Sequence, residues 1–164
     1  MPEQHPVRIG GSEVTTAEST VVLSPYDGHE VARIPRCRPE PVDQAVAAAR
    51  AAMAHPLPPW RRAEILDAAA AAVADHRDEL AHLIAEEAAK PIRTARTEAE
   101  RAVLTFQSAA IEARTLTGDV VPLDGAQPGD GKLGFTLRVP RGVVAAISPF
   151  NFPLNLVVHK VAPA

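Results

Sequence analysis

The stretch 138–164 constrains the fold more than any other part of the chain. Val143–Ile147 is apolar at every position, which predicts a strand covered by helices on both faces, as in a parallel sheet. Ser148–Asn151 predicts a sharp turn, and Leu154–Val161 predicts a helix with Pro153 in its first turn. A strand, a turn and a helix in this order form the first unit of a doubly wound parallel sheet.

The chain ahead of this unit predicts short antiparallel strands followed by helices. Val7–Val14 alternates around a Gly-Gly turn, and Ser19–Leu23 and Glu30–Ile34 flank a second cluster of turn residues. Alanine-rich segments with apolar positions at helical spacing predict three helices. These helices are expected over Val42–Ala54, about Arg61–Ala88 and about Ile92–Leu116. The fold class is therefore α/β, with Leu133–Val139 as a further, partly exposed strand.

Charge and hydropathy exclude several classes of partner. The net charge of −3 and the absence of a long basic run argue against a nucleic-acid-binding protein. No apolar stretch reaches the roughly 20 residues that span a bilayer, and the first residues lack the layout of a signal peptide. The single cysteine, Cys37, excludes an internal disulfide and fits a reducing compartment. We therefore expect a cytoplasmic protein without membrane or nucleic-acid partners, and no metal site.

Asn151 is the polar residue that the predicted turn presents. Ligands of open α/β sheets bind beyond the carboxyl ends of the strands, which is where Asn151 would lie. Its amide offers two N–H donors that could stabilise negative charge on a carbonyl oxygen. Taken alone, however, an asparagine near a helix start is more often a cap or turn residue. The residues by themselves favour this structural interpretation.

A resemblance changes this balance. The segment VPRGVVAAISPFNFPLNLVVHKVAPA is similar to the strand-turn-helix segment of the NAD(P)-dependent aldehyde dehydrogenase superfamily. SPYDGHEVARIP, the long helical stretch that ends at Lys90-Pro91, and GDVVP resemble earlier parts of the same family. The resemblance covers nearly all of the chain. It implies that residues 1–164 are part of the N-terminal, cofactor-binding domain of a longer fold.

The resemblance also implies roles for individual residues. Asn151 falls on the oxyanion-hole asparagine, which steadies the thiohemiacetal formed when a cysteine attacks the aldehyde. The segment that lines the ribose and nicotinamide of NAD or NADP corresponds to Ile147, Ser148, Pro149 and Phe150. The helix face that borders the substrate tunnel corresponds to Phe152, Asn155, Leu156 and His159. Their spacing independently predicts one side of a helix, and His159 is expected to be a wall of the tunnel.

Other parts of the family's machinery have no counterpart here. Cys37 does not match the nucleophile, and no residue matches the glutamate base, so the chain alone is expected to be inactive. Residues 132–140 resemble a strand for oligomerisation or interdomain contact, which implies a homo-oligomer in the complete enzyme. Ala89 stands where the family usually has glycine, and a left-handed helix end there would be strained. A non-enzymatic interaction module and one half of a split enzyme are the alternative functions.

Overall fold

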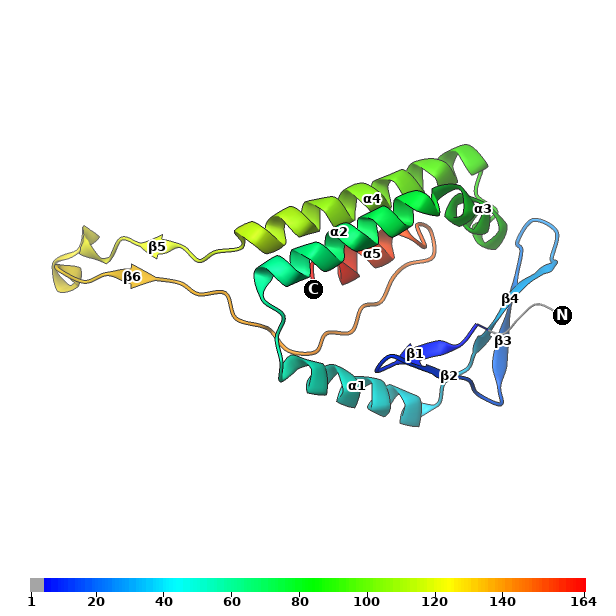
Figure 1. The fold of residues 1–164 in the computed structure, drawn as a ribbon, viewed down its shortest axis with the longest axis horizontal. Coiled ribbons are helices and arrows are strands. Elements are labelled where there is room, and N and C mark those ends of the chain that lie inside the picture. Colours follow the sequence, from blue (N-terminus) through cyan, green and yellow to red (C-terminus); the bar gives the residue numbers. More distant parts are fainter. Residues whose placement is uncertain (1–4) are drawn as a thin grey trace.

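The computed structural model describes residues 5–164 and begins with two antiparallel hairpins (Figure 1). In the first, β1 (Val7–Ile9) pairs with β2 (Ser12–Val14). Gly10 and Gly11 form its turn with φ values of 58° and 85°, a region that favours glycine. In the second, β3 (Ser19–Leu23) pairs with β4 (Glu30–Pro35). Both hairpins confirm the sequence prediction.

Helices build the main part of the molecule. They are α1 (Pro39–Met53), α2 (Pro59–Asp75), α3 (Arg77–Ala88), α4 (Ile92–Thr115) and α5 (Asn155–Val161). The last four form what we call the helical body, in which α2 lies along α4 and α5 lies beside both (Figure 1). Its interior is made largely of alanine, with Ala63 and Ala70 on α2 and Ala99, Ala102 and Ala110 on α4 all buried. Small side chains let the helix axes approach closely, which compensates for an aromatic content of only 4%.

One predicted helix is two helices. The prediction of a single helix over Arg61–Ala88 is wrong, because α2 ends at Asp75 and α3 begins at Arg77. His76 between them has φ −100° and ψ 15°, outside the helical region. The polar run from Asp75 to Glu79 interrupts the apolar stripe at this point. The break lets α3 turn and bury Ala81 and Ile84 against the start of α4.

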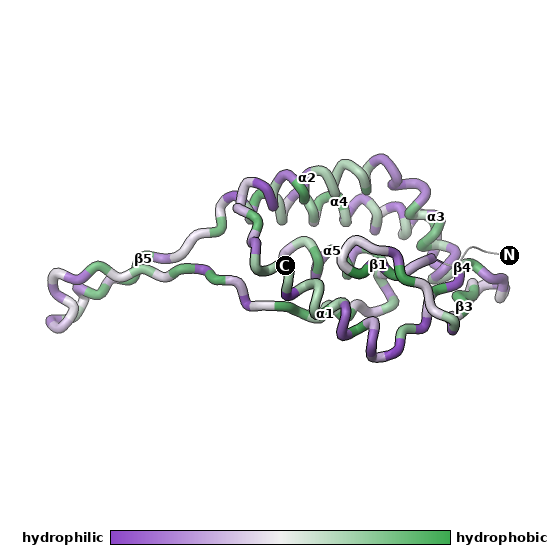
Figure 2. The backbone as a smooth tube through the Cα atoms, turned by 60° about the horizontal axis from the view of Figure 1, so that its bottom comes forward, coloured by the Kyte–Doolittle hydropathy of each residue, from purple (hydrophilic) through white to green (hydrophobic). Residues whose placement is uncertain are grey.

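A long connecting segment separates α4, which ends at Thr115, from α5, which begins at Asn155. Residues 117–140, which we call the arm, project from one end of the helical body (Figure 1). Within the arm, β5 (Val120–Val121) pairs with β6 (Gly134–Phe135), joined through turns at Leu123–Gly125 and Gln127–Gly129. The strand expected over Leu133–Val139 is therefore only two residues long. Figure 2 shows hydrophobic stretches along the arm where it lies apart from the helices.

The buried strand expected at Val143–Ile147 is not formed. These residues are extended but belong to no sheet, and Val144 and Ile147 are 65% and 84% exposed. A strand is defined by backbone hydrogen bonds to a neighbour, and no other described segment lies beside this one to provide them. The described residues thus contain no parallel strand pair, and every sheet among them is an antiparallel pair. The turn and helix that follow are present, with α5 beginning at Asn155.

Candidate active site

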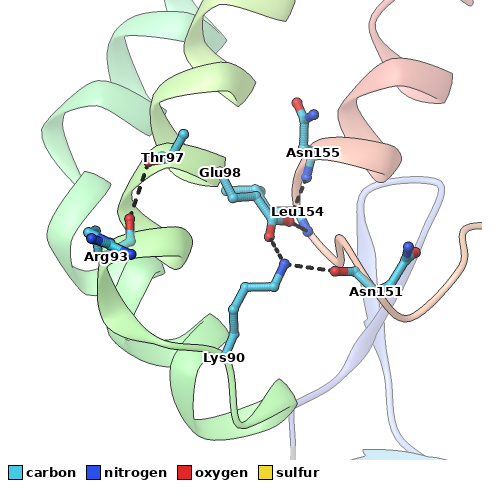
Figure 3. Close-up of polar contacts among 7 residues, drawn as sticks. All are labelled: Lys90, Arg93, Thr97, Glu98, Asn151, Leu154 and Asn155. Atoms are coloured by element: carbon cyan, nitrogen blue, oxygen red, sulfur yellow. Dashed lines mark hydrogen bonds and ion pairs between the residues drawn. The ribbon is translucent and has the colours of Figure 1, made fainter.

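Asn151 lies at the tip of the turn that leads into α5. Residues 150–154 form this turn, and the backbone N–H of Leu156 donates to the carbonyl of Phe152 at 3.1 Å. Asn151 is exposed, and Figure 3 shows its side-chain amide directed away from Lys90 and Glu98. The two amide N–H groups of Asn151 are therefore open to a ligand on that side.

Glu98 of α4 holds the start of α5 from the interior. Its side chain has no exposed surface, and one carboxylate oxygen accepts backbone N–H bonds from Leu154 at 2.9 Å and Asn155 at 3.1 Å. The other oxygen accepts a bond from the Lys90 ammonium at 2.6 Å. A buried carboxylate is tolerated when it is paired and hydrogen-bonded in this way. The backbone at 154–155 is thereby fixed to α4.

Lys90 connects the same carboxylate to Asn151 itself. Its ammonium donates to the backbone carbonyl of Asn151 at 2.7 Å and lies 3.9 Å from the centre of the Phe152 ring. The second contact is a cation–π interaction. Lys90 leaves α3 through Ala89, which has φ 48° and ψ 34°, the left-handed conformation expected for that position. The turn is thus held at the carbonyl of Asn151, at the ring of Phe152 and at the N–H groups of Leu154 and Asn155.

Leu154 anchors the turn through apolar contact. It packs against the cluster of Ala81, Ile84 and Ala95 and also against the cluster of Ala102, Val158 and Ala162. The residue next to Asn155 therefore bridges both hydrophobic clusters of the helical body. Leu154 is only partly buried, but its contacts with both clusters oppose movement of the turn.

The residues matched to the cofactor site lie in the extended segment before the turn. Ser148 is half-buried, Pro149 is exposed, and Ile147 and Phe150 are 84% and 91% exposed. Within the described part of the chain, no side chain or backbone group donates to or accepts from residues 141–150. Among the described residues, the segment before Asn151 is therefore positioned by chain continuity alone.

The four residues matched to the substrate tunnel do not share one surface. Phe152 precedes α5 and lies beneath Lys90, and Leu156 is half-buried. Asn155 is 8% exposed, and its side-chain oxygen accepts a long hydrogen bond of 3.5 Å from the Thr105 hydroxyl. Asn155 and His159 both line an open groove of about 1000 Å³ between α2, α4 and α5. Asn151 is not part of that groove.

The groove is largely apolar but carries charged residues. Leu66, Leu104 and Ala109 are among its walls, and Arg62, Arg101 and Glu112 also line it. The Nε atom of Arg62 is buried and has no hydrogen-bond partner among the described residues. Cys37 lies elsewhere, exposed between β4 and α1. Among residues 5–164 no cluster of histidine, cysteine or acidic side chains could hold a metal ion.

Sequence reasoning missed the roles of Glu98 and Lys90. A signal was present, because Glu98 stands three residues after Ala95 and four before Ala102, on the buried face of α4. A charged residue on such a face needs a partner. The partner could not be identified without the structure, since Asn151 lies 61 positions after Lys90 in the sequence.

The comparisons with known proteins agree with one another. The aldehyde dehydrogenase family matches residues 13–164. A 3-sulfolactaldehyde dehydrogenase of Priestia aryabhattai is 40% identical over 162 residues, which are 99% of this chain and 34% of that protein. In the described part of the chain no helix is both long and apolar enough to cross a membrane.

Two solved structures share the fold. Aldehyde dehydrogenase 21 of Physcomitrella patens, in complex with succinate as reaction product, superimposes with a TM-score of 0.92 at 34% identity, covering 99% of this chain and 34% of that one. The NADP-dependent glyceraldehyde-3-phosphate dehydrogenase of Bacillus halodurans, in complex with NADP, has a TM-score of 0.92 at 31% identity, covering 98% and 35%. The chain thus spans about a third of the length of these relatives.

Proposed function

Because this chain belongs to the aldehyde dehydrogenase family, we propose that it is the N-terminal part of an enzyme that oxidises an aldehyde to a carboxylic acid with NAD or NADP. The observation that carries this proposal is the exposed amide of Asn151 on a turn whose backbone is held by Lys90, Glu98 and Leu154. A donor fixed in advance does not have to reorganise when charge develops.

In the proposed mechanism Asn151 acts on the aldehyde oxygen. A cysteine attacks the carbonyl carbon, and the oxygen becomes an anion that accepts a hydrogen bond from the Asn151 side chain. Cys37 is exposed between β4 and α1, so we assign the nucleophile, and the glutamate base, to parts of the enzyme outside these 164 residues. On this proposal the 164 residues alone have no dehydrogenase activity.

The bound nicotinamide cofactor supplies the hydride acceptor. Ile147, Ser148, Pro149 and Phe150 would border its ribose and nicotinamide, as the resemblance implies. The NADP complex of the Bacillus halodurans relative supports NAD or NADP as the cofactor. Phe152, Asn155, Leu156 and His159 would border the aldehyde path, as the resemblance implies.

The substrate we favour is a short aldehyde with an anionic group. The names of three relatives include 3-sulfolactaldehyde, glyceraldehyde 3-phosphate and succinate as product, all of which carry a negative charge. These compounds indicate which aldehydes to test first.

The test is the Asn151→Ala variant of the complete enzyme. The rate of NADH or NADPH formation from 3-sulfolactaldehyde, glyceraldehyde 3-phosphate and succinate semialdehyde is followed by absorbance. We expect kcat to fall by roughly 10²–10³, as for loss of an oxyanion-hole donor. Gln107→Ala removes an exposed amide from α4 and is the matched control. No turnover of any of these aldehydes by the wild-type enzyme, or an Asn151→Ala rate within threefold of wild type, would contradict the proposal.

We further infer that the arm is the surface through which copies of the complete enzyme assemble. Five of its apolar side chains are more than half exposed: Val120 at 75%, Leu133 at 80%, Phe135 at 62%, Leu137 at 73% and Val139 at 79%. Exposed apolar patches of this kind mark interaction sites, and the free edges of β5 and β6 can pair with another strand. The same features favour the interaction module over the split enzyme as the alternative function.

A further inference from the structure

We propose that Glu98 and Lys90 form a positioning pair that sets the direction of the Asn151 amide, and that this pair is needed for turnover. The inference rests on the proposed function of Asn151 as the oxyanion donor. It assigns a role to two residues that never touch the aldehyde. They act through the backbone of the turn between 151 and 155 (Figure 3).

The pair reaches both sides of the turn. Lys90 donates to the carbonyl of Asn151, and Glu98 accepts from the N–H groups of Leu154 and Asn155. The two side chains are joined by their own contact of 2.6 Å. Because the backbone that follows the Asn151 Cα atom is fixed at the Asn151 carbonyl and at the N–H groups of Leu154 and Asn155, the side chain of Asn151 projects in the direction away from the pair. That direction is the one in which its amide is free (Figure 3).

Every polar atom of the pair has a function in this arrangement. Glu98 is 0% exposed in its side chain and uses both oxygens, and Lys90 is 12% exposed and makes two hydrogen bonds besides its contact with the Phe152 ring. A helix end could be held by one neutral acceptor. A buried carboxylate with a buried ammonium is more than this task requires, and buried ion pairs are costly unless their geometry is complete. The additional contact they provide is the one to Asn151.

Glu98→Gln separates the two tasks of Glu98. The side-chain oxygen of glutamine can still accept from Leu154 and Asn155, but its NH₂ group then faces the Lys90 ammonium, and two donors cannot bond to each other. The start of α5 is retained while Lys90 loses its partner. Lys90→Met removes the contact to the Asn151 carbonyl directly and also leaves the buried Glu98 carboxylate without its cation, so this variant is expected to lose stability as well.

The experiment compares these variants in the complete enzyme. Displacement of a reacting group by about 1 Å can lower a rate by about 10²-fold. We expect kcat and kcat/KM for the aldehyde to fall together by roughly 10- to 100-fold in each variant, which marks an interaction made in the transition state. The KM for the nicotinamide cofactor should stay within about twofold of wild type.

A second measurement separates positioning from folding. Hydrogen exchange of the peptide that contains residues 150–157 should show wild-type protection of the Leu154 and Asn155 amides in Glu98→Gln, despite the lower rate. The double variant Glu98→Gln/Lys90→Met should be no slower than the slower single variant, because both remove the same contact. Glu100→Gln, on the exposed face of α4, is the matched control and should behave as wild type.

The outcomes are distinct. Wild-type rates in both single variants, or losses that multiply in the double variant, would overturn the positioning pair while leaving the proposed function intact. A rate loss accompanied by loss of protection at 154–155 in both variants would show a purely structural role and would also overturn it. An inactive wild-type enzyme would overturn the proposed function and the positioning pair together.

Discussion

The helical body and the arm differ in how far their apolar side chains are buried and their backbone groups paired. In the body, Ala63, Ala99, Ala102 and Ala110 are fully buried and α5 is held by side chains from α4. In the arm, two-residue strands carry apolar side chains that are mostly exposed. The same contrast extends to Val143–Ile147, which is apolar and uncovered.

The difference follows from where each element finds its hydrogen bonds. A helix pairs its own N–H and C=O groups four residues apart, so α2 and α4 need only an apolar face to pack. A strand depends on a neighbour that is often distant in sequence. The chain can therefore build its helices completely, while its apolar extended segments lie without partners among the described residues.

The largest expected effect is on the interior of the body. Ala70 on α2 is 3% exposed and Ala71 is exposed, so the two neighbours form a matched pair. Ala70→Leu should lower the free energy of unfolding by about 1–3 kcal/mol through overpacking. Ala71→Leu should change it by less than about 0.5 kcal/mol. Urea unfolding followed by circular dichroism measures both, and equal effects would show that the body is loosely packed.

A smaller, stabilising effect is expected between α3 and α4. Ala89 has a φ of 48°, which is unfavourable for a residue with a Cβ atom. Ala89→Gly should raise the free energy of unfolding by about 1 kcal/mol, because glycine adopts this conformation without strain. The exposed helical position Ala71 is the comparison, where Ala71→Gly should lower the same quantity by roughly 0.5–1 kcal/mol. A loss at both positions would exclude strain at Ala89.

A still smaller effect concerns pH. Partial burial raises the pKa of the Glu87 carboxyl on α3 above its ordinary value. The folded state therefore keeps this proton to higher pH than the unfolded state does, and stability falls as the pH rises from the ordinary pKa through the folded one. Glu87→Gln should raise the melting temperature at about pH 7 but not at about pH 4. The control is Glu100→Gln, and an equal gain at both pH values would contradict this cause.

The smallest expected change in stability belongs to the arm. Phe135 on β6 is 62% exposed, so Phe135→Ser should alter the free energy of unfolding of the helical body by less than about 0.5 kcal/mol. In the complete enzyme the same substitution should weaken assembly, which sedimentation velocity reports as a shift to smaller species. Ser108→Ala on α4 is a control outside the arm. An unchanged sedimentation profile would remove the arm from the proposed interface.

Local patterns made much of the body predictable from sequence. Apolar spacing and proline positions gave α4 within one residue of its observed end, and the two hairpins followed from their turn residues. The break at His76 was missed, because the polar run there is compatible with an exposed helix face. Val143–Ile147 was misjudged because its composition describes the environment of a complete sheet, and hydropathy cannot show whether the neighbouring strands are present.

The candidate site, too, was only partly predictable from the sequence. The sequence motif identified Asn151 and the segment before it, and these residues remain the proposed site. The contacts that fix them come from Glu98 and Lys90, which no local pattern connects to Asn151. Such contacts depend on how α4 lies against the turn, and this is a property of the tertiary fold.

The attachment of residues 151–155 to α4 has a consequence for variation in chain length. Both ends of the excursion over residues 116–150 are fastened to the same helix, one by continuity with α4 and the other through Glu98. Doubling the length of such a loop adds only about 0.6 kcal/mol of closure entropy. Insertions and deletions in the arm can therefore accumulate without displacing Asn151, and on the roles proposed above the assembly could diversify while the chemistry stays constant.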